Sequence, residues 1–128
     1  MEHLAVIFIL LMLAVAFLQS GFDKMFDWKG NFEFMNKHFE KSPFRDVVKI
    51  NLFIIMLLEL VSGGLALLAI VLIFISGELG VAKIAAVLSA LTLGCLFTGQ
   101  RLAKDYVGAQ TIVVYLIPVF FLLWLLFG

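Results

Sequence analysis

The amino-acid sequence predicts an all-α fold: an integral membrane four-helix bundle with an amphipathic interfacial helix between spans one and two. Of its 128 residues, 64% are hydrophobic and only 14% are charged, whereas a soluble domain of this size needs more polar surface. Four apolar runs are long enough to cross the ~30 Å hydrocarbon core, which takes about 20 helical residues. The connections are short, so the spans are expected to pack as one membrane domain, residues 1–128.

The first span is expected over residues 4–22. No Lys or Arg precedes Lys24, and a cleaved secretory signal would have a basic start, so this span is predicted to be retained. Polarity rises over residues 23–46, where apolar side chains recur at helical spacing: Trp28, Phe32, Met35 and Phe39. A helix over about 28–40 is too short and too charged to span, so it is predicted to lie in the membrane interface.

The other three spans are expected over residues 47–75, 79–98 and 106–127. Ser42 and Pro43 are typical of an N-cap and a first helical position, so the second helix is expected to begin there, before its span. The third span has a small residue at every fourth position, which favours close packing in lipid: Ala82, Ala86, Ala90 and Gly94. Cys95, the only cysteine, is predicted to be a structural thiol packed among helices.

Glu59 is the residue around which a site is expected, because it places one carboxyl group inside the second span. Counted from Ile50 at ~1.5 Å per residue, it lies ~13 Å deep. Small residues follow it on the same helix face at Ser62, Gly63 and Ala66, so this face is predicted to meet another helix. A charged residue there costs ~2.5–3.5 kcal/mol on insertion scales. Glu59 is therefore expected to be protonated unless a cation or hydrogen-bond donors meet it.

The candidate partners of Glu59 come from the ends of the spans beside the polar connections: Gln19, Ser20, Lys24, Arg101, Gln110 and Tyr115. The preferred arrangement is a polar cavity that opens toward the connections, with Glu59 and Tyr115 at its bottom. Three roles stay open for it. It is a structural network in which Glu59 bonds to Tyr115 or Gln19, a site for a quinone or another amphipathic molecule, or a path for protons or ions.

The sequence offers no nucleophile with its base, no phosphate-binding loop and no metal-ligand cluster. His3 and His38 have no partners at haem or zinc spacing, so both are expected to be surface residues. We therefore predict no catalytic residue, no metal site and no covalently bound cofactor. The net charge of zero gives no reason to expect a nucleic-acid partner.

Two segments resemble DoxX-like membrane proteins. Residues 17–24 (FLQSGFDK) resemble the end of that family's first helix, and residues 58–67 (LELVSGGLAL) resemble its second helix. The positions that match are Ser20, Gly21, Lys24, Glu59 and Gly63. The resemblance implies a four-helix protein of the bacterial inner membrane, in a family that includes membrane subunits of thiosulfate:quinone oxidoreductases.

Size and resemblance together predict a non-catalytic subunit or accessory protein of a larger inner-membrane complex, respiratory or quinone-linked. It would at most be the membrane subunit of an oxidoreductase, with membrane lipid and other membrane subunits as partners and a quinone as the candidate cofactor. The alternative is a protein that binds or transports a quinone-like or lipid-like molecule in the cavity around Glu59. Fold-level analogy does not decide between them.

The distribution of charge predicts an orientation. The chain has nine Lys and Arg residues, and all except Lys83 lie in or beside the two polar connections, residues 23–46 and 98–105. The positive-inside rule therefore places these connections in the cytoplasm. The resemblance implies the opposite, since members of the family often carry Arg at the termini, and the residues of this chain are given more weight.

Overall fold

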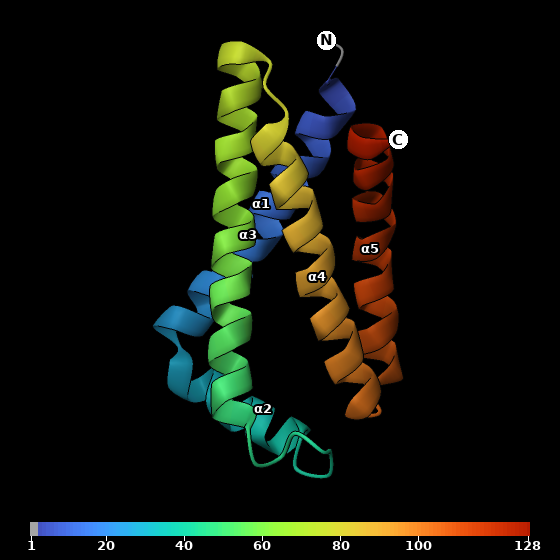
Figure 1. Ribbon diagram of the computed structural model, residues 1–128. Helices are drawn as coiled ribbons and strands as arrows, with labels where there is room; N and C mark the ends of the chain where they lie inside the picture. Colours follow the sequence, from blue (N-terminus) through green and yellow to red (C-terminus); the bar gives the residue numbers. More distant parts are fainter. Residues whose placement is uncertain (1–2) are drawn as a thin grey trace.

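The computed structural model describes residues 3–128, and this part of the chain contains five helices and no strand (Figure 1). They are α1 (Leu4–Phe26), α2 (Trp28–His38), α3 (Val48–Ser76), α4 (Gly80–Leu102) and α5 (Tyr106–Phe127). All except α2 are long and apolar enough to cross a membrane. The predicted fold class, an all-α membrane bundle with a short helix after the first span, is confirmed.

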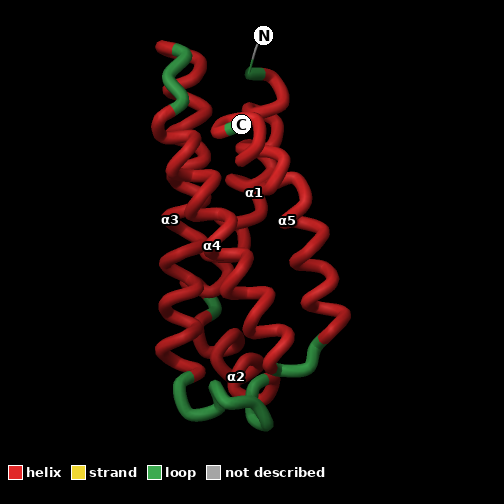
Figure 2. The backbone as a smooth tube through the Cα atoms, turned by 45° about the vertical axis from the view of Figure 1, so that its right-hand side comes forward, coloured by secondary structure: helices red, strands yellow, loops and turns green. Residues whose placement is uncertain are grey.

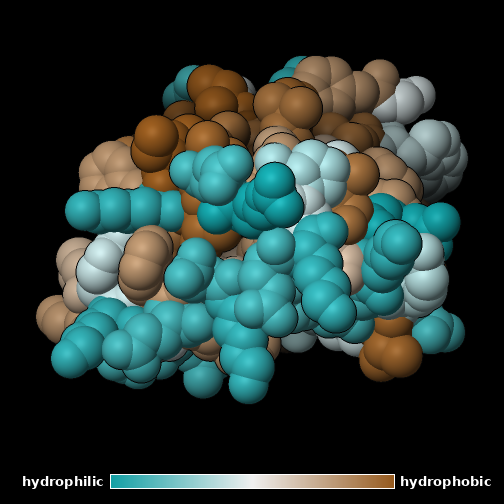
Figure 3. Space-filling model, turned by 90° about the horizontal axis from the view of Figure 1, so that it is seen from below, coloured by the Kyte–Doolittle hydropathy of each residue, from teal (hydrophilic) through white to brown (hydrophobic). Residues whose placement is uncertain are grey.

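The four long helices run up and down, so the two polar connections lie at one end of the bundle. The N-terminal end of α1 and the C-terminus lie at the other end, with the α3–α4 turn (Figure 1). Helix α2 and the α4–α5 connection lie together at the lower end in both backbone views (Figure 2). Hydrophilic residues gather on that end face (Figure 3). A membrane protein with this shape has one strongly polar end.

The long helices form a row of pairs and not a fully closed ring. Helix α1 packs along α3, α3 against α4, and α4 against α5. The contact between α1 and α5 is short, and α3 and α5 do not contact each other within the described residues. Each helix therefore keeps an outward apolar face, as expected where lipid surrounds the bundle.

Helices α1 and α3 approach closely because each places a glycine under a leucine of the other. A Cβ atom at Gly21 would lie 2.6 Å from Leu60 Cδ2, and one at Gly63 would lie 2.7 Å from Leu18 Cγ. The same Cβ atoms would lie only 3.3 and 3.1 Å from the backbone nitrogens of Leu60 and Leu18. This reciprocal contact sets the spacing and register of the two helices.

The apolar core fills the half of the bundle that lies nearer the termini. Its fully buried members come from all four long helices and include Leu10, Leu13, Ala66, Ala69, Ala82, Ala86, Val119 and Leu122. In the half nearer the connections, α4 has no buried residue after Leu93, and α5 buries only Ala109 before Val119. Helices α4 and α5 are therefore loosely packed in this half, whereas α3 still buries Val48, Leu52 and Met56 there.

The helix start expected at Ser42 and Pro43 is wrong, since α3 begins at Val48. The hydroxyl of Ser42 accepts a hydrogen bond from the Phe44 amide at 3.1 Å and donates one to the Phe39 carbonyl at 3.0 Å. These bonds close a turn, which is the other common use of serine beside proline.

The boundaries of three other helices also differ from expectation. Helices α1 and α4 continue to Phe26 and Leu102, past the expected ends at residues 22 and 98. Polar residues at these ends still continue a helix, so a change in hydropathy marks the membrane boundary and not the helix boundary. Helix α2 ends at His38, two residues before its expected end at 40.

Candidate functional site

The buried carboxylate of Glu59 pairs with the ammonium of Lys24. Their Oε1 and Nζ atoms lie 2.8 Å apart, and only 4% of the Glu59 side chain and 14% of the Lys24 side chain are exposed. The direction of approach lies outside hydrogen-bond geometry, so the contact is an ion pair without a directed hydrogen bond. Lys24 also donates a hydrogen bond to Ser20 Oγ at 2.7 Å, one turn earlier in α1.

The glycine contacts between α1 and α3 position this ion pair. Lys24 follows Gly21 by three residues, and Glu59 directly precedes Leu60, the residue that packs over Gly21. The same close approach that needs a glycine therefore brings the two charges together. Removing one partner of a buried pair leaves an uncompensated charge, which costs about 3–5 kcal/mol. The pair therefore stabilises the register of α1 against α3 that the glycine contacts set.

A second polar contact links α3 to α4 near the middle of both helices. The oxygens of Ser62 and Thr92 lie 3.1 Å apart, and both side chains are fully buried. The Thr92 hydroxyl donates a hydrogen bond to the Leu88 carbonyl oxygen at 2.8 Å. In the interhelical bond Ser62 is therefore the donor and Thr92 the acceptor. Contacts between buried polar side chains thus link α1 to α3, through Lys24 and Glu59, and α3 to α4, through Ser62 and Thr92.

The other predicted partners of Glu59 lie on exposed faces: Gln19, Arg101, Gln110 and Tyr115. Tyr115 is 38% exposed on α5, which makes no contact with α3 within residues 3–128. Arg101 instead stacks over the Tyr106 ring, 4.5 Å from its centroid. The expected bond from Glu59 to Tyr115 or Gln19 is therefore wrong, because α5 packs along α4 and Lys24 reaches the carboxylate first. Of the predicted set, the structure brings together Glu59, Lys24 and Ser20.

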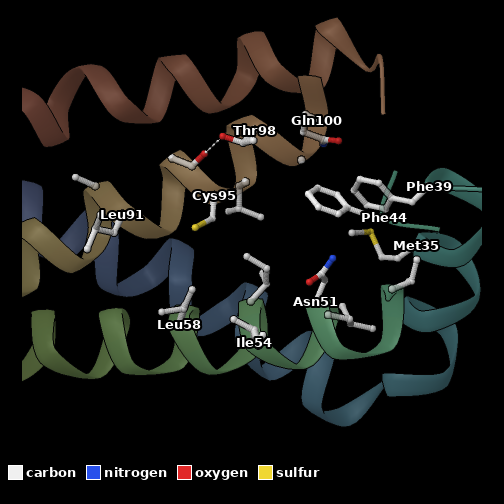
Figure 4. A pocket seen from close by; sticks show the side chains of 17 residues that line it. Met35, Phe39, Phe44, Asn51, Ile54, Leu58, Leu91, Cys95, Thr98 and Gln100 are labelled. Carbon is white, nitrogen blue, oxygen red and sulfur yellow. Dashed lines mark hydrogen bonds between the residues drawn. The ribbon is translucent and has the colours of Figure 1, made fainter. Parts of the chain in front are cut away.

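The cavity lies elsewhere, between the lower halves of α3 and α4 (Figure 4). It has a volume of about 580 Å³. Most of its lining is apolar and comes from four parts of the chain, including Met35 of α2, Phe39 and Phe44 of the following turn, Ile55 and Leu58 of α3, and Leu91 and Gly94 of α4. Glu59 is not among its lining residues, so this cavity is not the one expected around the carboxylate.

The cavity forms where the small residues of α4 lose their packing partner. Ala82 and Ala86 are fully buried, as the predicted close packing requires. Ala90 and Gly94 continue the same stripe but line the cavity, and a Cβ atom at Gly94 would meet nothing within 4 Å. Cys95 is exposed and also lines the cavity, so the prediction of a packed thiol is wrong.

The mouth of the cavity opens sideways between two membrane-spanning helices. Among the lining residues, Ile54 is 46% exposed and Leu91 is 60% exposed, and Thr98 and Cys95 are exposed as well. These positions belong to two of the four helices that are long and apolar enough to cross a membrane, so the mouth lies between two spans. A molecule dissolved in the membrane can reach it without entering water.

Met35, Phe39 and Phe44 form the end of the cavity beside the polar connections, which we call its floor, and His38 holds this floor against the end of α4 and the α4–α5 connection. Its Nε2 atom lies 2.8 Å from Gln100 Oε1 and 3.6 Å from Asp105 Oδ2. Its ring stacks on Phe34 and meets the edge of Phe39, with centroids 5.5 and 5.0 Å away. The expectation that His38 is an isolated surface residue is therefore wrong. Its polar partners, Gln100 and Asp105, lie more than 60 positions away in the chain, beyond the reach of spacing arguments.

Asn51 is the cavity residue that sequence reasoning missed. It lies in the first turn of α3, and its amide points into the space between α3 and α4 (Figure 4). The amide makes no hydrogen bond to another group of residues 3–128. Its position in the sequence could have identified it, because Asn51 precedes Ile55 and Leu58 by four and seven residues and so lies on the same face of the helix.

The fold defines an integral membrane protein, with a cavity that opens between two of its spans. No group of three or more metal-ligating side chains occurs among the residues that the structure describes. No family model, curated protein or solved structure matches this chain. The resemblance to DoxX-like proteins therefore stays a prediction.

Proposed function

We propose that this integral membrane protein binds a small lipid-like molecule in the cavity between α3 and α4. The observation that carries the proposal is an apolar cavity of about 580 Å³ whose mouth faces the lipid. Small-molecule sites in proteins are mostly apolar and measure ~300–1,000 Å³. The binding function predicted from the sequence is thus kept, but its place moves from Glu59 to the other face of α3.

Lateral access suits a ligand that is concentrated in the bilayer. The α3 and α4 side chains at the mouth are apolar except for Thr98, whose hydroxyl already donates to the Gly94 carbonyl, so a hydrocarbon chain can enter without leaving that hydroxyl unpaired. Met35 and Phe39 close the end toward the connections. A quinone with a short tail satisfies the same description as a lipid, and it stays a candidate ligand.

The proposal is tested by filling the cavity from Gly94. Leucine at position 94 has room for its Cβ atom and extends into the cavity, so Gly94→Leu should displace the ligand without unfolding the protein. Gly64→Leu is the matched control, because Gly64 also has open space around its Cβ position but does not line the cavity. Native mass spectrometry of protein released from nanodiscs reports the molecules retained.

Wild type and Gly64→Leu should retain a bound lipid-like or quinone molecule, and Gly94→Leu should lose most of it. Equal retention by all three proteins would overturn the proposal. The mass of the retained molecule distinguishes a quinone from a lipid.

A second candidate function is that of a non-catalytic subunit in a larger inner-membrane complex, respiratory or quinone-linked as the resemblance implies. It is favoured by α5, of whose most apolar stretch only 17% is buried, against 33% for each of the other three spans. Helix α5 also leaves large aromatic side chains exposed, where another subunit could cover them: Phe120, Phe121 and Trp124. Crosslinking from these positions in native membranes should capture a subunit if this function is correct, and only lipid if it is not.

The cytoplasmic location of the polar connections is also proposed, from the positive-inside rule. It is tested by single cysteines at Lys41 and Glu78 in a Cys95→Ala background, since these exposed residues lie in connections at opposite ends of the bundle. An impermeant thiol reagent added to intact cells should label position 78 and not position 41. The reverse labelling would invert the orientation.

A further inference from the structure

We infer that the cavity takes an uncharged amphiphile whose head group carries a hydroxyl beside an ester or carbonyl oxygen, as a monoacylglycerol does. The inference rests on the proposed function and names its ligand class. Three features of the cavity carry it: the absence of charge in its lining, the free amide of Asn51, and the position of that amide near the membrane surface.

The lining selects against a charged head group. No Asp, Glu, Lys or Arg is among the residues that line the cavity. The buried ion pair of Glu59 with Lys24, and the contact of Asp105 with His38, lie outside this lining. A phosphate or carboxylate enclosed by these residues would meet no counter-charge in the lining, and burying an unpaired charge is strongly unfavourable.

Of the amide and hydroxyl side chains in the lining, only that of Asn51 makes no hydrogen bond at all within the described residues. The Thr98 hydroxyl donates to the Gly94 carbonyl at 2.9 Å, and Gln100 Oε1 lies 2.8 Å from the His38 ring nitrogen. The Asn51 amide, by contrast, keeps both its NH₂ donors and its oxygen acceptor within the described residues. A hydroxyl donates to the amide oxygen, and an ester oxygen accepts from the amide nitrogen. A head group with carbonyls alone would leave the amide oxygen unpaired.

The position of Asn51 matches the depth at which a lipid carries its head group. It is the fourth residue of α3, at the end of the helix that meets the polar connections. Ile54 and Leu58 line the cavity farther along α3, ~4.5 and ~10 Å toward the bilayer centre. A monoacylglycerol can therefore keep its head group at Asn51 and extend its tail past Leu58 and Leu91 toward the mouth. The ligand keeps the orientation that it has in the bilayer.

Cys95 provides a built-in reporter for the test. It is the only cysteine of the chain, it is exposed, and it lines the cavity. A ligand in the cavity should slow its modification by a small membrane-permeant thiol reagent in phosphatidylcholine nanodiscs. Three additives share the oleoyl chain and differ in the head group: monoolein, oleoyl lysophosphatidate, which adds a phosphate, and methyl oleate, which lacks hydroxyls.

Monoolein should slow labelling at a concentration about fivefold below that needed for methyl oleate, which keeps the ester oxygen but lacks the hydroxyl, since one uncharged hydrogen bond of ordinary net strength gives a preference of that order. Oleoyl lysophosphatidate keeps both groups but should also need a higher concentration than monoolein, because its phosphate meets no counter-charge in the cavity lining. Asn51→Leu should abolish the preference for monoolein over methyl oleate. Asn36→Leu makes the same chemical change on the exposed surface of α2, outside the cavity lining, and should keep the preference.

Each other outcome has a definite meaning. Equal or better protection by oleoyl lysophosphatidate or by methyl oleate would overturn the inferred head group but leave the proposed function intact. A preference that survives in Asn51→Leu would overturn the role of that amide. No protection by any additive, together with equal ligand retention by Gly94→Leu and wild type, would overturn both the inference and the proposed function.

Discussion

The two faces of α3 show opposite kinds of helix contact. Toward α1, α3 is packed along its length, with Gly63 under Leu18 and Glu59 paired with Lys24. Toward α4, packing is close only in the upper half, and a cavity of about 580 Å³ occupies the lower half. The α1 contact is held by a reciprocal glycine fit and an ion pair, whereas the lower α4 contact has neither. Specific paired contacts, and not small residues alone, keep these helices together.

The same lesson appears within α4 itself. Its small residues recur every fourth position, yet Ala86 is fully buried while Gly94 faces open space. Small side chains permit close approach but do not enforce it, because association in lipid needs van der Waals contact or hydrogen bonds from the opposite helix. The Ser62–Thr92 bond is the last such polar link before the cavity begins.

The largest effect should come from breaking the ion pair of the packed face. Lys24→Met and Glu59→Gln should each lower the free energy of unfolding by about 3–5 kcal/mol, because either change leaves one buried group without its partner. The double change should recover much of the loss. The free energies of unfolding of the single and double variants can be measured by titrating the purified proteins in mixed micelles with a denaturing detergent. If the loss of stability in the double variant equalled the sum of the losses in the two single variants, the two charges would not interact.

The next largest effect should distinguish two adjacent glycines. Gly63→Ala should destabilise the protein by about 1–3 kcal/mol, because its Cβ atom would lie 3.1 Å from the Leu18 backbone nitrogen and α1 would have to shift. Gly64→Ala should instead stabilise by up to about 1 kcal/mol, since alanine is the better helix former and the space is open. The same unfolding assay applies. Equal effects at the two positions would contradict the close contact of α1 and α3.

A smaller and more local effect is expected at the floor of the cavity. His38→Ala removes the contact with Gln100 and the stacking on Phe34, worth about 1 kcal/mol together. Amide hydrogen exchange over residues 28–47 should accelerate about fivefold, while exchange in α1 and α3 stays unchanged. A uniform acceleration over all helices would mean that His38 stabilises the whole bundle and not the floor alone.

The smallest effect should come from the polar link between α3 and α4. Ser62→Ala should cost about 0.6 kcal/mol, the average for interhelical hydrogen bonds in membranes, because Thr92 keeps its bond to the Leu88 carbonyl. Thermal unfolding in nanodiscs should detect the shift. A loss as large as that of Lys24→Met would assign the main stabilising role to this link.

The spans and their order followed from the sequence because lipid allows only helices of sufficient apolar length. Glu59, Lys24 and Ser20 were also among the predicted site residues, since a buried carboxyl group demands a partner. The choice of Lys24 over Tyr115 depended on the register of α1 against α3. That register is set by the fit of Leu18 over Gly63, which spacing along the chain does not reveal.

The cavity and its floor could not be predicted for a related reason. The small residues of α4 that end at Gly94 predict close contact with another helix. Because α4 diverges from α3 toward the polar connections, a cavity lies beside Ala90 and Gly94 instead. His38 finds Gln100 and Asp105 because the fold brings both connections to one end of the bundle. Asn51 lies near the start of a helix, where polar residues are common at the membrane interface. It can be distinguished from them only when the helix that faces it is known.

The most direct test of the lipid-facing site is to map where a membrane-dissolved molecule reacts with the protein. A hexadecanol with a diazirine in its tail can be photoactivated in nanodiscs, and the modified residues are then located by peptide mass spectrometry. We predict that adducts concentrate in residues 51–58 and 91–98 and that Gly94→Leu, but not Gly64→Leu, removes them. Adducts spread evenly over the outward faces of all four long helices, unchanged by Gly94→Leu, would contradict the site.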